Sequence, residues 1–165
     1  MLALGDNIHP TIQPSSSIRA IPDSDRANFK LLTYSTWFSP PTGVHPQSTF
    51  WAQLNRPKQI RMVAQFRLGS HQLNIETLRW GAERLPRSQR HCKCCNLGVR
   101  EDELHMLYCP FYFDIRHDHH IHMPSITDSE DSTMNHIMNN TPWHILASFL
   151  IACFEKRNKH LENNN

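Results

Sequence analysis

The feature that most constrains the fold of this chain is a short segment, residues 91–110, which contains four of its five cysteines. Cys92 and Cys95 form a C-x2-C pair, and His105 and Cys109 follow as an H-x3-C pair. The first spacing suits a tight turn that directs two thiolates at one ion, and the second places both side chains on one face of a helix. Three thiolates and one imidazole are a usual ligand set for structural zinc. We therefore predict one Zn²⁺ bound by these four side chains.

The other cysteines and a group of histidines leave alternatives open. One alternative is that Cys94 replaces Cys92 or Cys95 as a ligand, although C-x2-C presents its two sulfurs better than C-x-C does. Buried thiols without a metal, and a redox pair, are the other interpretations of the cluster, whereas an odd number of cysteines fits a disulfide framework poorly. Cys153 lies in an apolar stripe and is predicted to be part of the core. A group of four histidines is predicted to be solvated surface, and a second metal site is the alternative. These residues are His117, His119, His120 and His122.

Positive charge is concentrated in one part of the chain. Residues 56–100 contain ten Lys or Arg and two Glu, a net charge of +8, whereas the rest of the chain carries −6. Such a segment is a candidate surface for nucleic-acid phosphates, because each neutralised phosphate releases condensed counterions. An ordinary solvated basic face is the alternative. The residues predicted to contact the phosphate backbone are Arg61, Arg67, Arg79, Arg84, Arg87, Arg90, Lys93 and Arg100.

Composition divides the chain into four regions. Residues 1–46 hold six of the eleven prolines and are predicted to be a flexible, disordered lead-in. Residues 47–123 combine a basic helical segment with the Cys3His module, and residues 124–141 are polar and predicted to be a loop. Residues 142–161 are predicted to form a helix that packs on the rest. The predicted fold class is mainly α, a small helical domain stapled by zinc at a C-x2-C knuckle.

Within these regions, apolar periodicity and proline positions indicate individual helices. Helices are predicted over residues 57–69, 73–80, 101–108 and 143–160, with another that begins at Pro110.

Several protein classes are disfavoured by what the sequence lacks. The apolar run 145–154 is too short to span a bilayer, and the first ten residues lack the basic start and apolar stretch of a signal peptide. A membrane or classically secreted protein is not expected, so we expect an intracellular location, in the nucleus or the cytoplasm. No H-E-x-x-H motif, paired-Asp tract or phosphate-binding glycine loop occurs, and four protein ligands leave a metal no open position. Enzyme activity is therefore not expected.

The sequence around the predicted ligands carries a family resemblance. It comprises IRMVAQFRLGSH at 60–71, LNIE at 73–76, the Cys and His ligands with the acidic run at 101–103, and CPFY at 109–112. Together with FLIACFEKR at 149–157, these segments resemble the C-terminal tail of reverse transcriptases from non-LTR (LINE-like) retrotransposons. The family usually has four residues between the His and the last Cys, whereas this chain has three.

The resemblance implies a zinc-binding tail that binds template RNA or target DNA and that associates with a polymerase. The polymerase domain of that family has no counterpart in this sequence, so the chain is expected to be a fragment or relic without polymerase activity. A protein-interaction module stapled by zinc, with an incidental basic face, is the alternative function. The residues themselves do not decide between RNA and DNA.

Overall fold

The computed structural model describes residues 53–80, 84–123 and 130–164. The predicted lead-in, residues 1–46, lies outside the described residues, as do residues 124–129 of the predicted loop. The described part of the chain is mainly helical, which confirms the predicted fold class. Its extended pairing is limited to one antiparallel bridge between His91 and Arg100.

The predicted helices are present, with some changes at their ends. Pro57 opens the first one, where its missing N–H has no intrahelical partner in any case. The helix predicted over 73–80 is only one turn long, and Pro110 begins a 3-10 turn that leads into the next helix. The α-helices are α3 (Pro57–Arg67), α4 (Asn74–Thr77), α5 (Glu103–Tyr108), α6 (Phe113–Asp118), α7 (Glu130–Asn140) and α8 (Trp143–Asn163), with 3-10 turns at Arg87–Gln89 (η2) and Pro110–Tyr112 (η3).

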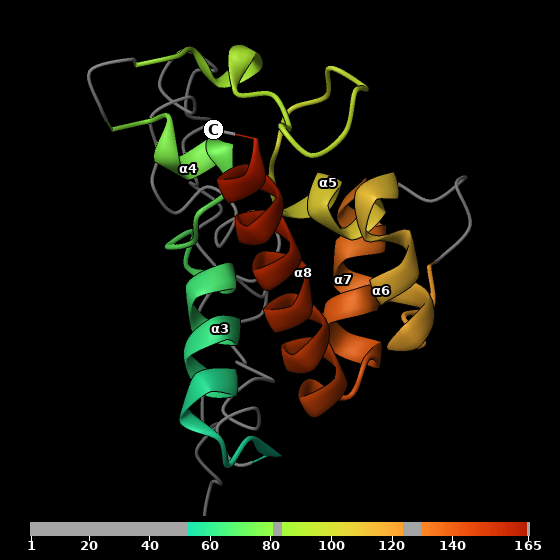
Figure 1. The fold of residues 1–165 in the computed structure, drawn as a ribbon. Coiled ribbons are helices and arrows are strands. Elements are labelled where there is room, and N and C mark those ends of the chain that lie inside the picture. Colours follow the sequence, from blue (N-terminus) through green and yellow to red (C-terminus); the bar gives the residue numbers. More distant parts are fainter. Residues whose placement is uncertain (1–52, 81–83, 124–129, 165) are drawn as a thin grey trace, which may run out of the picture.

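Helix α8 is the central element of the fold. Figure 1 shows α3 on one side of α8 and α5, α6 and α7 on the other. On the first side, Lys58 of α3 donates to Glu155 of α8 at 2.6 Å. On the second side, Lys156 of α8 donates to Asp114 of α6, also at 2.6 Å. Because α8 packs on both sides, it needs apolar residues around much of its circumference.

The core contains the apolar stripe that was predicted for this helix. Leu146, Phe149 and Leu150 are completely buried, and Cys153 is buried with them, as predicted. Of the remaining predicted stripe, Phe154 is buried and Ile145 is half-buried. Burial of each large apolar side chain stabilises the fold by about 1.5–3 kcal/mol. Other fully buried members of the same cluster are Val63, Phe66, Leu73, Leu107, Met134 and Ile137.

The prediction of a polar loop over residues 124–141 is wrong for Glu130–Asn140, which form α7. Met134, Ile137 and Met138 follow one another at helical spacing and are all buried. Their apolar face is narrow, and the polar residues that surround it dominate the composition. Packing of that narrow face against the core stabilises a helix that would be too short to persist alone.

Candidate metal centre

The four predicted ligands converge on one point. The Sγ atoms of Cys92, Cys95 and Cys109 and a ring nitrogen of His105 all lie within 4.8 Å of one another. In a tetrahedral zinc site, Zn–S of about 2.3 Å and Zn–N of about 2.0–2.1 Å separate a sulfur from a nitrogen by about 3.6 Å. The distance from Cys95 Sγ to His105 Nε2 is 3.5 Å. The donor set and its spacing therefore fit a tetrahedral metal ion.

The first two ligands lie on a turn that the backbone closes. Cys92 N–H donates to the carbonyl of Val99 at 2.8 Å, and Glu101 N–H donates to the carbonyl of Arg90 at 2.8 Å. Inside the turn, the N–H of Cys94 points at Cys92 Sγ at 3.4 Å, a donor that stabilises a thiolate. Gly98 has a φ of +63°, which a residue with a Cβ adopts at a cost. The sequence thus folds locally into the predicted knuckle.

The other two ligands are positioned by α5. Asp102 is the N-cap of this helix, and its carboxylate accepts from the N–H of His105 at 2.9 Å. Cys109 follows the last residue of α5, and its N–H donates to the carbonyl of His105 at 2.6 Å. Arg116 of α6 then donates to the carbonyl of Cys109 at 2.7 Å. These bonds hold His105 and Cys109 one turn apart on the side that faces the knuckle.

The structure separates Cys94 from the four-ligand group. Its sulfur groups instead with Cys92 and Glu101, and Tyr112 Oη donates to it at 3.8 Å. The Glu101 carboxylate already accepts two bonds from Arg157, so it is a poor metal ligand. The geometry therefore favours Cys95 over Cys94 as the second thiolate of the knuckle.

The thiols share hydrogen bonds, and these bonds determine where negative charge is favoured. Hydrogen bonds from Cys109 first, and then from Cys94, lower the pKa of Cys92. The bond to the Cys92 sulfur, followed by burial, raises the pKa of Cys109, and burial raises the pKa of Cys95. The cluster thus favours a thiolate at Cys92 and protonated thiols around it. Metal binding displaces such protons, so affinity depends on pH.

A buried ion pair beneath the knuckle was not predicted from the sequence. Arg157 of α8 donates from Nε and Nη2 to the two carboxylate oxygens of Glu101, each at 2.8 Å. The N–H of Asn74 donates to the same carboxylate at 2.7 Å, and its side chain donates to the carbonyl of His91 at 2.7 Å. The network joins α4, the knuckle and α8. A second buried pair joins His71 Nε2, in the segment between α3 and α4, to Glu103 Oε1 of α5 at 2.9 Å.

The eight predicted phosphate-contacting residues have different environments. Arg90 is buried and donates to the carbonyls of Leu85 and Ile75, so it stabilises the fold. Arg67 and Arg79 are also buried, and Nη1 of Arg79 lies 3.7 Å from Oε2 of Glu76. Arg100 is partly buried and pairs with Asp102 at 2.6 Å. The remaining four are exposed or half-buried, namely Arg61, Arg84, Arg87 and Lys93.

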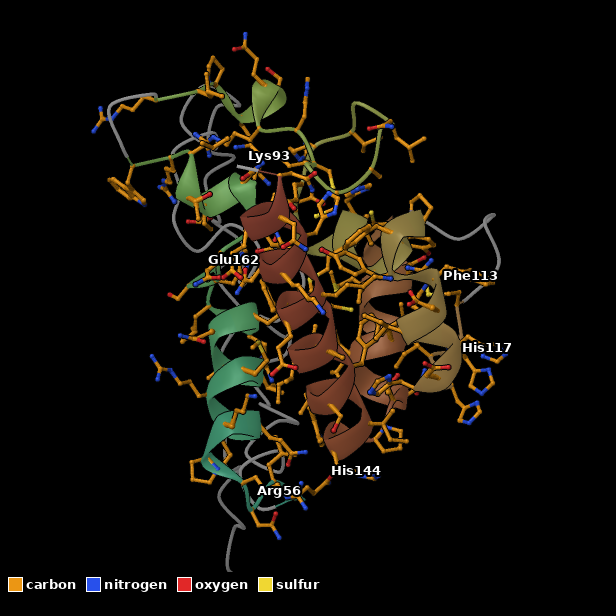
Figure 2. All side chains as sticks on the ribbon, viewed as in Figure 1. Arg56, Lys93, Phe113, His117, His144 and Glu162 are labelled. Carbon is orange, nitrogen blue, oxygen red and sulfur yellow. The ribbon has the colours of Figure 1, made fainter. Side chains whose placement is uncertain are left out.

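The histidine group does not assemble into a metal site among the described residues. His117 is exposed and lies 3.7 Å from Asp118, and Figure 2 shows its side chain pointing away from the helices. His119 Nδ1 contacts the carbonyl of Ile115 at 2.9 Å. His120 and His122 are exposed. The placement of His117, His120 and His122 agrees with the predicted solvated surface, whereas His119 is half-buried and its ring lies 6.2 Å from that of Phe149.

Together, the fold and the site define a small, mainly helical domain with a candidate Cys3His metal centre. A scan against protein-family models, a search of curated proteins and a search of solved structures found no match to this chain. Among the described helices, none combines the length and the apolar character that a membrane span requires.

Proposed function

We propose that this chain is a zinc-binding module that contacts nucleic acid, in the manner of the retrotransposon reverse-transcriptase tails that it resembles. The single observation that carries the proposal is the convergence of three sulfurs and one imidazole nitrogen within 4.8 Å. Thiolates with an imidazole in tetrahedral geometry favour zinc over hard cations such as Mg²⁺ or Ca²⁺.

The proposed role of the metal is structural. Cys92 and Cys109 are buried, and four protein ligands leave no coordination position for water or substrate. The bound ion would join the knuckle to the end of α5. Its binding free energy would therefore contribute directly to the stability of the fold.

The nucleic-acid part of the proposal is supported by the cationic side chains that remain accessible. Arg84 and Lys93 are exposed and Arg87 is half-buried, and all three lie in the segment that carries the knuckle. No described carboxylate lies within 4 Å of their charged nitrogens. Cationic groups without a described carboxylate partner bind phosphates without first giving up an ion pair.

Two measurements test the two parts of this proposal separately. The full-length chain, purified reduced and with zinc, should contain one equivalent of zinc by elemental analysis; well under one equivalent refutes the metal assignment. A salt titration of nucleic-acid binding should give a steep slope of log K against log salt. Replacement of Arg84 and Arg87 by Ala should make this slope shallower, reducing its magnitude by about one or two. Lys159→Ala should leave the slope unchanged.

A protein-interaction module is the second candidate function, and one observation favours it. Leu97 and Val99 are exposed at the tip of the knuckle, and Phe113 is exposed on the outer side of α6 (Figure 2). Exposed apolar side chains on a rigid turn are suited to a protein partner. If the zinc-loaded chain binds no nucleic acid even at low salt, this second function replaces the first.

A further inference from the structure

A surface hollow of about 470 Å³ lies beside the knuckle. Four arginines and one tryptophan line it, namely Arg79, Trp80, Arg84, Arg87 and Arg90. Among the described lining residues none is acidic. Its volume is within the range of small-molecule sites, about 300–1,000 Å³. The hollow thus combines concentrated positive charge with an aromatic surface.

Two of these arginines belong to the framework of the hollow. Arg90 is held by its bonds to two backbone carbonyls, at 2.9 and 2.7 Å. Arg79 is buried, and its guanidinium carbon lies 4.9 Å from the centroid of the Trp80 ring. A guanidinium over an indole is a favourable cation–π contact, which fixes the orientation of the ring.

The other two arginines are available to a ligand. Arg84 is exposed and Arg87 is half-buried, and neither is paired with a described carboxylate. Burial first, and then the nearby charge of Arg100, lowers the pKa of Arg87, whereas the charges of Asp102 and Glu103 raise it. A phosphate in the hollow would add a negative charge beside Arg84 and Arg87.

Trp80 presents a flat apolar surface at the same place. The Trp80 side chain is 57% exposed, whereas Leu73 and Ile75, at the start of the preceding helix α4, are buried. An exposed indole beside cationic groups resembles the stacking platforms of proteins that bind single strands, where aromatic rings stack on bases. In a duplex both faces of each base are already stacked, so a tryptophan on a protein surface reaches a base more easily in a single strand.

We propose that this hollow binds one nucleotide of a single-stranded nucleic acid, with the base stacked on Trp80 and the phosphate contacted by Arg84 and Arg87. This inference rests on the proposed nucleic-acid function and adds to it base stacking and a preference for single strands. The binding mode is independent of base identity, because every base has a π-face.

The test uses the full-length, zinc-loaded chain and fluorescein-labelled ten-nucleotide probes, oligo(U) RNA, oligo(dT) DNA and a mixed-sequence DNA duplex, in anisotropy titrations. Trp80→Ala should weaken binding of both single strands by about tenfold or more and change duplex binding less than about twofold. Trp80→Phe should retain most of the single-strand affinity. Phe113→Ala, which removes an aromatic side chain that is 68% exposed on α6, is the matched control and should have no effect.

The outcomes separate this inference from the function on which it rests. Unchanged single-strand affinity in Trp80→Ala, together with weaker binding in Arg84→Ala/Arg87→Ala, overturns the stacking site and leaves phosphate binding intact. Equal losses for single strands and duplex in Trp80→Ala overturn it as well. Absence of binding by the wild-type chain to all three probes at low salt refutes the proposed function itself. Zinc content and far-UV circular dichroism confirm that each variant is folded.

Discussion

Replacement of Arg157 by Met should destabilise the protein strongly. Arg157 and Glu101 are a buried pair, with side chains only 4% and 2% exposed. Met keeps much of the length and apolar volume of the arginine stem but removes the guanidinium. The Glu101 carboxylate would then retain a charge in the interior, with the N–H of Asn74 and the more distant thiol of Cys92 as its donors among the described residues.

The expected magnitude follows from this geometry. Two unit charges about 4 Å apart attract each other by about 4 kcal/mol at the effective dielectric constant of about 20 that suits protein sites. Breaking a buried pair from one side costs about 3–5 kcal/mol, which agrees. In a chain of 165 residues a loss of about 4 kcal/mol lowers the melting temperature by about 8–16 °C.

Urea unfolding of the zinc-saturated protein, followed by far-UV circular dichroism, measures this loss. Lys58→Met is the matched control, because it removes an ion pair to Glu155 whose side chains are 69% and 64% exposed. An exposed pair contributes at most about 1 kcal/mol. The double variant Glu101→Leu/Arg157→Met removes both charges and should recover part of the stability, leaving the cost of one unpaired Asn74 N–H, about 1–3 kcal/mol.

Two results would refute this reasoning. The first is an Arg157→Met variant that loses no more stability than Lys58→Met does. The second is a double variant that is no more stable than the single one, since the penalty would then not come from an uncompensated carboxylate.

Other predictions concern the knuckle and the helices. Cys94→Ser should keep one zinc equivalent and its helical signal, whereas Cys95→Ser should lose both; the reverse result in elemental analysis would exchange the two ligand assignments. Because burial raises the pKa of Cys95, protons compete with the metal there, and zinc affinity measured against a chromophoric chelator should fall as the pH falls. Asp102→Ala removes the cap of α5 and should cost about 1 kcal/mol in urea unfolding. Ile137→Ala should cost about 2–5 kcal/mol, and a negligible loss would show that α7 is not part of the core.

The ligand set could be predicted from the sequence because its information is local. Cys92 and Cys95 are close enough in sequence to share a turn, and His105 and Cys109 are one helical turn apart. Spacing alone therefore places them in two pairs. The structure adds that the turn and the helix face each other.

The buried ion pair could not be predicted in this way. Glu101 and Arg157 are 56 positions apart, and nothing near either residue indicates its partner. Counting charges also treated Arg90 as a surface cation, whereas its guanidinium binds two backbone carbonyls in the interior. A charge count records how many arginines a segment has, but not toward which side each one points.

Helix α7 was missed for a related reason. Its polar residues outweigh Met134, Ile137 and Met138 in any average over the segment. Only the positions of those three residues, on one face, indicate a helix.

The position of Arg157 also has a consequence for the order in which the protein assembles. The four candidate metal ligands lie within residues 92–109, so a metal ion bound there would close a short loop, whereas the Glu101–Arg157 pair spans 56 positions. Short loops close faster and at lower entropic cost, so the knuckle should form before α8 docks and neutralises the buried carboxylate. If zinc holds the knuckle, as proposed, a chain that is short of zinc would lack the ordered partner of Arg157 on α8. The docking of α8 would then be weaker, and metal limitation should be observed as aggregation of the newly made chain.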